Sequence, residues 1–450
     1  MPMPDPLAIE PIAPFNAALR LPGSKSLTNR ALLLAALANG TSELTGVLFS
    51  DDTRRMLDAL GRLGFTLDID EAGKRVTVHG AAGRLPRDRA ELDLGNAGTA
   101  IRSLTAACCL GPGPYRLDGI ARMRQRPIGE LVDPLRQLGA DVQYLGDDGY
   151  PPLQVGAPHG LPGGEVTMAP TLSSQFISAL LMVAPCCRDG LTLRFDGPVT
   201  SRPYVEMTLR LMQRFGAKVN VDDAFTRVRV EPGGYTARAY DIEPDASNAS
   251  YFLAAAAVVP GSRCVIESLG RASLQGDVHF ADVLGRMGAA VRLQDDAITI
   301  TSPANGKSLQ GVDVDLNRMP DTAQTLATVA LFADGPTTIR NVGNLRVKET
   351  DRLAALDNEL TKLGATVRIV GDDITITPPA HGRIQPAAID TYDDHRMAMA
   401  FAVVGLRAPG VVINDPACVN KTFPDFFDYL DRLRDAASAD ATAKAEGAGG

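Results

Sequence analysis

Apolar and polar residues along this chain switch repeatedly between the period of a helix and the period of a strand. Five segments, such as "LGRLGFTLDI" and "LTKLGATVRI", begin helix-periodic, reach Leu, Phe or Met followed by glycine, and continue as a short alternating strand. The shared glycines recur every 72 to 77 residues and are Gly64, Gly139, Gly216, Gly288 and Gly364. We predict that each is the C′ residue that ends a helix and turns the chain into a strand.

A second set of segments lies between the first, and each member is a strand, a polar turn, an Ala-rich helix and another strand. Six such segments begin near Ser26, Gly98, Ser174, Asn248, Asp321 and Asp394. This alternation predicts an α/β (α+β) protein built from six repeated units of about 75 residues. Because equivalent turns of a repeat lie at one end of an architecture, we expect the polar helix starts to converge on one cleft.

Six units divide naturally into two domains of three. We expect residues 23–239 to form one domain, and residues 1–21 with 242–434 to form the other. The last helix, "FFDYLDRL", has no strand after it, so the N-terminal strand near Ala17 to Leu21 is expected to complete that unit. Residues 435–450 are small and polar, and we expect a disordered tail.

Composition narrows the class of protein. The 450 residues carry a net charge of −8, which argues against a nucleic-acid partner, and no apolar run approaches the roughly 20 residues of a membrane helix. The first residues, "MPMPDPLAIEP", lack the features of a signal peptide, so a cytoplasmic protein is expected. None of the six cysteines has C-x-x-C spacing, and we expect buried, reduced thiols and no metal site.

The stretch "LPGSKSLTNRALLLAALANG" begins like a phosphate-binding loop and ends like an apolar helix. It is not a Walker loop, because Ser24 separates Gly23 from Lys25 and the upstream glycine is missing. Ser24 and Ser26 are candidate caps for a helix from about Thr28. The stretch is therefore either a capped helix or an anion site at a helix start, where a bound anion would offset the cost of the nearby cations.

Other helix starts and loops carry polar residues of the same kinds. Three arginines share the loop "IARMRQRPIG", and Arg is suited to bidentate carboxylate or phosphate recognition. Lys348 and Arg352 would be a like-charge i,i+4 pair on a helix, and Glu349 with Arg352 could be a plain surface pair. Caps and solvated loops explain each motif singly, whereas repeated cations at helix starts indicate a cleft for several negative charges. The further candidates are Asn96, Gly98, Thr99, Ser173, Ser174, Gln175, Arg122, Arg124, Arg126, His395, Arg396 and Lys421.

Seven collinear motifs resemble the 5-enolpyruvylshikimate-3-phosphate synthase family over residues 9–433. They are "LPGSKSLTNRALLLAAL", "LGNAGTA", "RPIG", "SSQF", "RVKETDRL", "TYDDHRMAMA" and "NKTFPDF". The resemblance implies a two-domain fold in which each domain has three βαβαββ repeats around a pseudo-threefold axis. It also implies transfer of the enolpyruvyl group from phosphoenolpyruvate to the 5-hydroxyl of shikimate 3-phosphate, with release of phosphate and without a cofactor.

The resemblance also assigns candidate residues to each substrate. Those for shikimate 3-phosphate are Lys25, Ser26, Arg30, Ser173, Ser174, Gln175, Ser201, Asp321, Asn344 and Lys348. Those for phosphoenolpyruvate are Lys25, Asn96, Gly98, Arg126, Gln175, Arg352, Arg396 and Lys421. The candidate catalytic residues are Lys25, Asp321, Glu349 and His395. Asp321 is the expected base toward the 5-hydroxyl, and Glu349 with Lys25 the expected acid–base group at the methylene carbon.

Two other functions stay open on the sequence. The related enolpyruvyl transferase that acts on UDP-N-acetylglucosamine typically carries a reactive Cys on a loop of the first domain, and the comparable loop of this chain has none. A non-catalytic anion-binding protein of the same fold would be expected to lose its acid–base residues. We expect a monomer that binds its two small substrates. Glyphosate inhibits many family members, and Ser103 stands where many sensitive relatives carry proline, so reduced sensitivity is expected.

Overall fold

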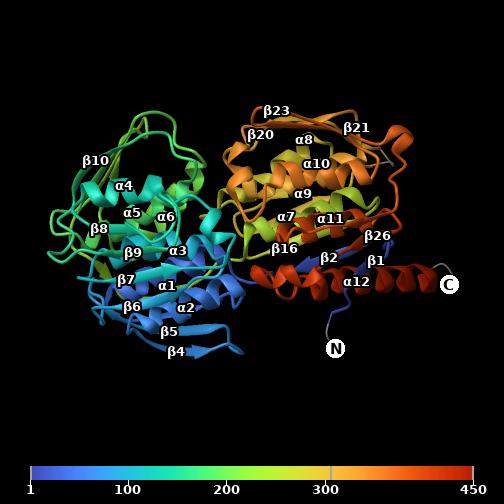
Figure 1. Cartoon of the computed structure of the whole chain (residues 1–450). Helices are drawn as coiled ribbons and strands as arrows, with labels where there is room; N and C mark the ends of the chain where they lie inside the picture. The colour runs from blue at the N-terminus through green and yellow to red at the C-terminus, as the bar shows by residue number, and fades with distance from the viewer. Residues whose placement is uncertain (1–2, 305–306, 448–450) are drawn as a thin grey trace. The chain divides into compact units, whose positions relative to one another are not determined.

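The computed structural model describes residues 3–304 and 307–447, and the chain divides into two compact units. The continuous unit comprises Pro22–Glu243, and the split unit comprises Met1–Leu21 together with Pro244–Gly450. Both units mix helices with small sheets, as the alternating pattern predicted (Figure 1). No helix among the described residues is long and apolar enough to cross a membrane.

The continuous unit holds three sheets, whose strands follow one another in space in the order named. The first sheet is β14 (Tyr235–Thr236), β3 (Ala38–Thr45), β5 (Arg75–Ala81) and β4 (Thr66–Asp70), with β15 (Ala239–Asp241) also on β3. The second is β6 (Ala90–Asp93), β7 (Tyr115–Asp118), β9 (Leu153–Gly156) and β8 (Asp141–Tyr144). The third is β10 (Gly164–Met168), β11 (Leu191–Phe195), β13 (Arg227–Val230) and β12 (Val219–Val221).

The described residues of the split unit also form three such sheets, together with the short pair β19 (Leu309–Gln310) and β21 (Ala333–Asp334). The first sheet is β2 (Asn16–Leu19), β16 (Arg263–Glu267), β18 (Ala297–Thr301) and β17 (Ala290–Leu293). The second is β20 (Asp313–Asp315), β22 (Thr337–Arg340), β24 (Asp373–Thr377) and β23 (Thr366–Val370). The third is β25 (Ala387–Ile389), β26 (Val411–Ile413) and β1 (Leu7–Ile9).

These six sheets begin with parallel pairing and continue with antiparallel strands. Four of the parallel pairs join strands that follow one another around a helix. The other two sheets exchange their first strands: β2 precedes α1 (Lys25–Leu37) but pairs with β16, whereas β15 precedes α7 (Ala246–Val258) but pairs with β3. These two of the six sheets are therefore each completed by a strand that is distant in sequence from its partner.

The strand that completes the sixth sheet is not the one expected from the sequence. Residues 17–19 belong to β2, where Ala17 and Leu19 face Cys264 and Ile266 of β16. The antiparallel partner of β26 is instead β1, whose Leu7 and Ile9 lie opposite Ile413 and Val411. The prediction failed because β1 is only three residues long, which is too short for its alternation to be recognised.

In the described part of the chain, six helices form the cores of the two units, and six others cover the sheets with one buried face. Every residue of α3 (Gly98–Cys108), α7, α9 (Ala323–Val329) and α11 (His395–Gly405) is buried, as is nearly all of α1 and α5 (Ser174–Val183). Their many alanines suit such enclosure, since a helix apolar on all sides is stable only inside a protein. The others are α2 (Asp51–Arg62), α4 (Gly129–Gln137), α6 (Arg202–Arg214), α8 (Phe280–Arg286), α10 (Arg352–Lys362) and α12 (Phe426–Gly447).

The five repeated glycines end the covering helices as predicted. Gly64, Gly139, Gly216, Gly288 and Gly364 follow the caps of α2, α4, α6, α8 and α10 with φ between 91° and 108°. This left-handed backbone favours glycine because a Cβ atom would be strained there. A strand begins within three residues of each glycine, so the repeated pattern was a correct guide to the element boundaries.

The last helix differs from the sequence expectation. α12 runs to Gly447, so residues 435–447 are helical where a disordered tail was expected, and residues 448–450 lie outside the described part. The alanines, lysine and glutamate of this segment have high helix propensity and can continue an established helix. Near its start, the Tyr429 hydroxyl donates to the Arg20 carbonyl at 2.9 Å, so this helix is tied to the segment after β2.

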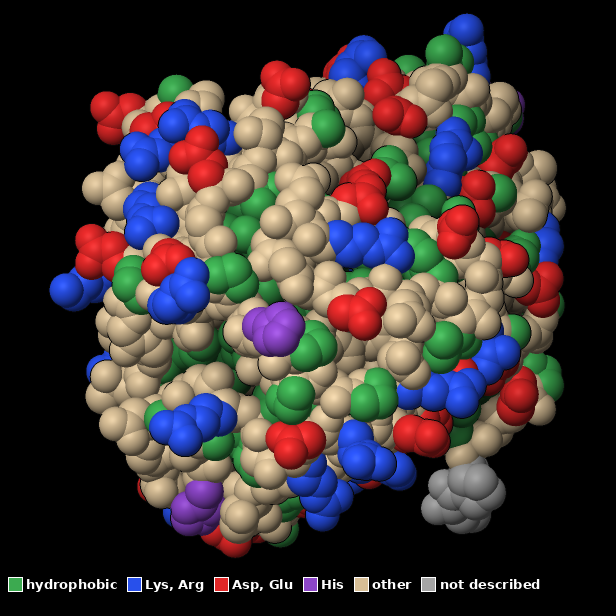
Figure 2. Space-filling view, turned by 60° about the vertical axis from the view of Figure 1, so that its left-hand side comes forward, with side chains coloured by type: hydrophobic (Ala, Val, Ile, Leu, Met, Phe, Trp, Pro, Cys, Tyr) green, Lys and Arg blue, Asp and Glu red, His purple; other side chains and the backbone are tan. Residues whose placement is uncertain are grey.

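The cysteines form no disulfide in the described part of the chain, and one face of the surface mixes charges of both signs (Figure 2). All six cysteines are free, and five are buried while Cys186 is half-buried. Burial raises the pKa of the Cys264 thiol to about 12, which keeps it protonated near neutral pH. On the face shown in Figure 2, basic and acidic side chains are interspersed. That face has the mixed charge of a typical protein surface.

Candidate active site

The start of α1 is a capped helix that also carries a partly buried ion pair. Ser24 is the N-cap, and its Oγ accepts from the Leu27 amide at 3.4 Å. The helix begins at Lys25, three residues earlier than predicted, so Ser26 lies in its first turn and is not a cap. The Lys25 ammonium lies 3.2 Å from a carboxylate oxygen of Asp52, on α2. Asp52 was not among the residues expected from the sequence.

Arg30 lies one turn further along α1 and is 3% exposed. Its Nε donates to the Thr208 hydroxyl at 2.8 Å, and its Nη1 donates to the Ser26 carbonyl at 3.0 Å. A longer bond of 3.5 Å joins Nη2 to the Ser178 hydroxyl. These three partners are neutral, and burial lowers the pKa of Arg30 to about 10. A buried guanidinium held by neutral groups is costly, and an anion would offset that cost.

The start of α3 brings together Asn96, Gly98 and Arg126. Arg126 Nη1 donates to the carbonyl and side-chain oxygens of Asn96 at 3.0 and 2.9 Å. A second arginine, Arg102, donates to the Gly98 carbonyl at 3.2 Å and was missed, although it stands four residues after Gly98 on the same helix face. A Cβ atom on Gly98 would lie 2.5 Å from Arg126 and 2.8 Å from Arg102. A side chain at this position would therefore displace at least one of the two guanidinium groups.

The start of α5 is capped by Ser173, whose Oγ accepts from the Gln175 amide at 3.2 Å. Ser174 is the first residue of that helix and is buried. Ser201 precedes α6 and is buried with a left-handed φ of 52°, an uncommon conformation for serine. Thr208 of α6 donates to Ser178 of α5 at 3.0 Å, and both contact Arg30. Arg30 therefore connects α1, α5 and α6 within the continuous unit.

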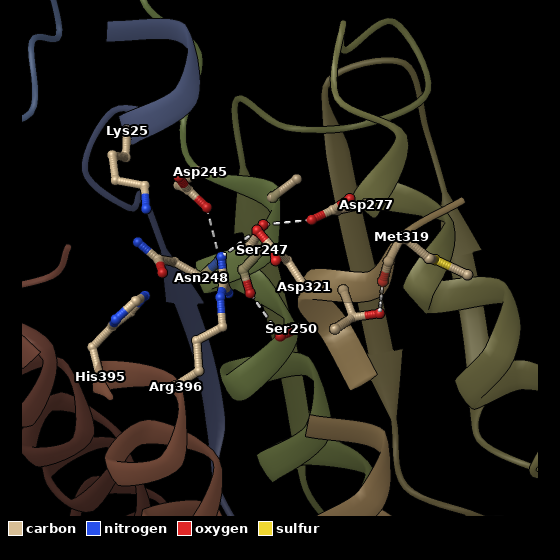
Figure 3. Close-up of polar contacts among 12 residues, drawn as sticks. Lys25, Asp245, Ser247, Asn248, Ser250, Asp277, Met319, Asp321, His395 and Arg396 are labelled. Atoms are coloured by element: carbon tan, nitrogen blue, oxygen red, sulfur yellow. Dashed lines mark hydrogen bonds and ion pairs between the residues drawn. The ribbon is translucent and has the colours of Figure 1, made fainter. Parts of the chain in front are cut away.

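In the split unit, two arginines and three carboxylates form a largely buried cluster. Arg352 Nε donates to Asp394 at 2.7 Å, and Nη2 donates to Glu349 at 2.9 Å. Arg352 Nη1 also reaches Asp321 at 3.5 Å, and Arg396 Nη2 donates to Asp321 at 2.8 Å. Arg396 and Asp321 point toward one another in Figure 3. Glu349 and Arg352 are thus a buried pair within this cluster, and the surface-pair alternative is wrong.

The carboxylates determine the charge state of Arg352. Burial by itself lowers the pKa of this guanidinium, but Asp394, Glu349 and Asp321 outweigh it and raise the pKa above its usual value. The Arg352 side chain is 1% exposed and is charged at any ordinary pH. Such a cluster can exchange protons with a ligand through its carboxylates while its arginines keep the charge balanced.

Asp394 organises the start of α11. It is the N-cap, accepts from the Arg396 amide at 2.9 Å, and is fully buried beside Arg352. His395 begins the helix as predicted; its ring is 1% exposed, with Nδ1 3.6 Å from Asp394. Asp394 was not expected as a site residue, although an Asp before a helix-periodic segment is a readable cap signal.

Lys348 and Arg352 do not share a helix, contrary to the expectation of a like-charge i,i+4 pair. Lys348 directly follows the 3₁₀ helix η7 (Gly343–Val347), and α10 begins at Arg352 after the N-cap Asp351. Asp351 accepts from the Leu353 and Ala354 amides, which explains the break. The remaining expected residues of this unit, Asn344 on η7 and Lys421 at the end of η9 (Pro416–Lys421), are each 9% exposed.

Side chains of the protein accept hydrogen bonds from backbone amides at the start of α7. Asp245 accepts from the Asn248 amide at 2.9 Å, and Gln275 accepts from the Ala246 amide at 3.0 Å. Ser247 donates to Asp277, as Figure 3 shows. The first turn of this helix is uncharged, whereas that of α1 carries Lys25.

Small repeated sheets, cations near several helix starts and a cluster of arginines with carboxylates together characterise this chain. The EPSP synthase (3-phosphoshikimate 1-carboxyvinyltransferase) family model matches residues 9–430. The chain therefore belongs to the EPSP synthase family.

Curated relatives and solved structures agree with this membership. The chain is 50% identical to the 3-phosphoshikimate 1-carboxyvinyltransferase of Laribacter hongkongensis, over 95% of this chain and 99% of the relative. It is 48% identical to the chloroplastic 3-phosphoshikimate 1-carboxyvinyltransferase of Arabidopsis thaliana, over 95% of this chain and 84% of that protein. An EPSP synthase structure from Acinetobacter baumannii superposes with a TM-score of 0.78 at 25% identity, covering 96% of this chain and 98% of that one.

Proposed function

We propose that this protein transfers the enolpyruvyl group of phosphoenolpyruvate to the 5-hydroxyl of shikimate 3-phosphate and releases inorganic phosphate. Relatives of about 50% identity over 95% of the chain carry the name of this activity, which favours it over transfer to UDP-N-acetylglucosamine and over a non-catalytic role. The structural observation that carries the proposal is the buried Arg30 guanidinium, which is held by neutral partners. Such a group suits an anionic substrate.

The reaction proceeds by addition and then elimination. In the addition, the 5-hydroxyl oxygen bonds to C2 of phosphoenolpyruvate, the hydroxyl loses its proton, and the methylene C3 gains one to become a methyl group. In the elimination, the bond from C2 to the phosphate oxygen breaks, C3 loses a proton, and the double bond re-forms. Each step needs a proton acceptor and a proton donor, and reversal of direction lets the same side chains serve both steps.

We assign the acid–base steps to four side chains. Asp321 accepts the proton of the 5-hydroxyl, and Glu349 acts with Lys25 at C3, while His395 is the remaining catalytic candidate. The contacts of Asp321 with Arg352 and Arg396 support this assignment, because they hold its carboxylate in a fixed position within the cluster. The carboxylates beside C2 would also stabilise positive charge that develops there.

The two substrates are assigned to two sets of side chains, which share Lys25 and Gln175. For shikimate 3-phosphate we propose Lys25, Ser26, Arg30, Ser173, Ser174, Gln175, Ser201, Asp321, Asn344 and Lys348. For phosphoenolpyruvate we propose Lys25, Asn96, Gly98, Arg126, Gln175, Arg352, Arg396 and Lys421. Arg102 joins the second set, because it donates to Gly98 beside Arg126.

Phosphate release measured with alternative acceptors tests the proposal. The purified chain should release phosphate from phosphoenolpyruvate with shikimate 3-phosphate and not with UDP-N-acetylglucosamine. The Asp321→Asn variant should lose this release, whereas Asp282→Asn, on the exposed face of α8, should keep it. The proposal would be contradicted if phosphate were released only with UDP-N-acetylglucosamine. It would also be contradicted if neither acceptor led to phosphate release.

A further inference from the structure

The segment that leads into α11 has a strained backbone. Tyr392 and Asp393 are consecutive, neither is glycine, and both have left-handed φ values, 57° and 54°. One such residue is uncommon, and two in a row persist only where the surroundings enforce them. The turn ends at Asp394, which caps α11 and bonds Arg352. Its conformation therefore determines where the Asp394 carboxylate lies.

A buried carboxylate outside the cluster holds this turn in place. Glu359 on α10 is fully buried, and its Oε2 accepts from the Asp390 amide at 3.0 Å. Its Oε1 accepts from the Tyr392 hydroxyl at 2.7 Å. The first bond holds Asp390, which precedes the two left-handed residues, and the second holds Tyr392, which is one of them.

Lys362, one turn further along α10, neutralises this carboxylate and adds a third attachment. Its ammonium lies 2.8 Å from Glu359 and 2.7 Å from the Asp390 carboxylate, and it donates to the Ala388 carbonyl at 3.3 Å. A buried carboxylate is costly unless its lone pairs are satisfied, and the turn and Lys362 satisfy those of Glu359. Two of the three partners of Glu359, Asp390 and Tyr392, thus belong to the segment that leads into α11.

The geometry of α10 links this clamp to the proposed site. Arg352 is the first residue of α10, and Glu359 follows seven residues later, on the same helix face and about 10 Å along the axis. The two elements joined by Glu359, α10 and the 390–394 turn, are those joined by the bond between Arg352 and Asp394. Two separated attachments fix both the distance and the direction of the turn relative to α10.

We propose that Glu359 is a positioning residue for the proposed reaction, which holds the Tyr392–Asp393 turn so that Asp394 can orient Arg352 and Arg396. It does not touch the reacting atoms and acts through Asp394. This inference rests on the proposed function, but the position of the turn can be measured without any activity.

The test compares Glu359→Gln with two other variants. Glu359→Gln keeps the shape of the side chain but weakens its bonds to Tyr392 and Lys362. We expect kcat to fall about tenfold with KM for both substrates changed less than about threefold, because bound groups are misaligned and not removed. Amide hydrogen exchange of residues 390–396 should become about tenfold faster, while exchange in the continuous unit stays unchanged.

A rescue variant separates positioning from general stability. Glycine adopts left-handed φ without strain, so Glu359→Gln/Asp393→Gly should recover at least about threefold of the lost kcat. The matched control is Tyr235→Phe, which removes a buried tyrosine bond to the Met182 carbonyl in the continuous unit. That variant should lose stability without slowing kcat.

The outcomes separate this inference from the proposed function. Unchanged exchange at residues 390–396 in Glu359→Gln would overturn the clamp, whatever the activity. An unchanged kcat in an active enzyme, or no recovery in the double variant, would overturn the positioning role. A wild-type chain that is inactive with shikimate 3-phosphate would contradict the proposed function, and faster exchange in its Glu359→Gln variant would still support the clamp.

Discussion

Two buried arginines, one in each unit, differ in what surrounds them. Arg30 is held by two hydroxyls and a carbonyl, and burial lowers its pKa to about 10. Arg352 is held by three carboxylates, which raise its pKa despite burial. The first guanidinium has charge left to offer a ligand, whereas the charge of the second is matched within the protein. The comparison supports the proposal that Arg30 binds an anion, whereas Arg352, proposed for phosphoenolpyruvate, is also paired with the carboxylates proposed for acid–base chemistry.

The largest effect is expected from Lys25→Met. Turnover should fall at least about a thousandfold, because the variant loses both a cation at the substrates and a proposed acid–base group. The variant also leaves Asp52 without the ammonium found 3.2 Å away, so Lys25→Met/Asp52→Asn is the matched variant for stability. Phosphate release and thermal unfolding are measured on the same samples. Near-wild-type turnover in either variant would remove Lys25 from the mechanism.

Arg352→Gln and Arg30→Gln test the comparison through stability. Removing Arg352 leaves three carboxylates near one another, two of them buried, so the free energy of unfolding should fall by about 3–5 kcal/mol. Removing Arg30 costs three hydrogen bonds but also removes a buried charge, so the loss should be about 1 kcal/mol or less. Urea unfolding monitored by circular dichroism gives both values. Equal losses of unfolding free energy in the two variants would show that the surroundings of Arg30 and Arg352 do not differ in their effect on stability.

A lower pH should relieve the effect of losing Arg352. In Arg352→Gln the crowded carboxylates repel one another, which favours their protonated forms in the folded state over the unfolded state. The folded variant then binds more protons, so its stability should rise relative to wild type as pH falls from about 7 toward 5. Unfolding midpoints at the two pH values provide the check. A stability difference that does not change with pH would argue that Glu349, Asp321 and Asp394 are not the source.

Gly98→Ala is expected to have a smaller, local effect. The added Cβ would lie 2.5 Å from Arg126, so that guanidinium must move by a few tenths of an ångström or more. We expect KM for phosphoenolpyruvate to rise about tenfold, with KM for shikimate 3-phosphate nearly unchanged. Ala100→Ser, on the same buried helix, controls for general disturbance of α3. A uniform rise in both KM values would contradict the assignment of Arg126 to phosphoenolpyruvate.

The smallest effect concerns glyphosate. The Ser103 hydroxyl donates to the Thr99 carbonyl one turn earlier, within the helix that begins at Gly98. Proline at this position would remove both that hydroxyl and a backbone donor, and so shift the helix start slightly. We expect Ser103→Pro to lower the inhibition constant for glyphosate by a few-fold. An unchanged inhibition constant would make Ser103 a tolerated helix residue without influence on the inhibitor.

The sequence predicted the repeat, the helix-ending glycines and the polar helix starts, because these depend on residues close together in the chain. It did not predict the partners that distinguish Arg30 from Arg352. Thr208 is 178 residues from Arg30, and Asp394 is 42 residues from Arg352, so neither contact leaves a local pattern. The exchange of β2 and β15 between sheets was missed for the same reason.

The binding of shikimate 3-phosphate to wild-type and Arg30→Gln protein, followed by isothermal titration calorimetry, tests the central claim most directly. If Arg30 holds its charge for this anion, the Kd should rise about 10- to 100-fold in the variant, the range expected for lost hydrogen bonds to a charged group. Circular dichroism confirms that the variant is folded at the temperature of the titration. Equal Kd values for the two folded proteins would contradict the account.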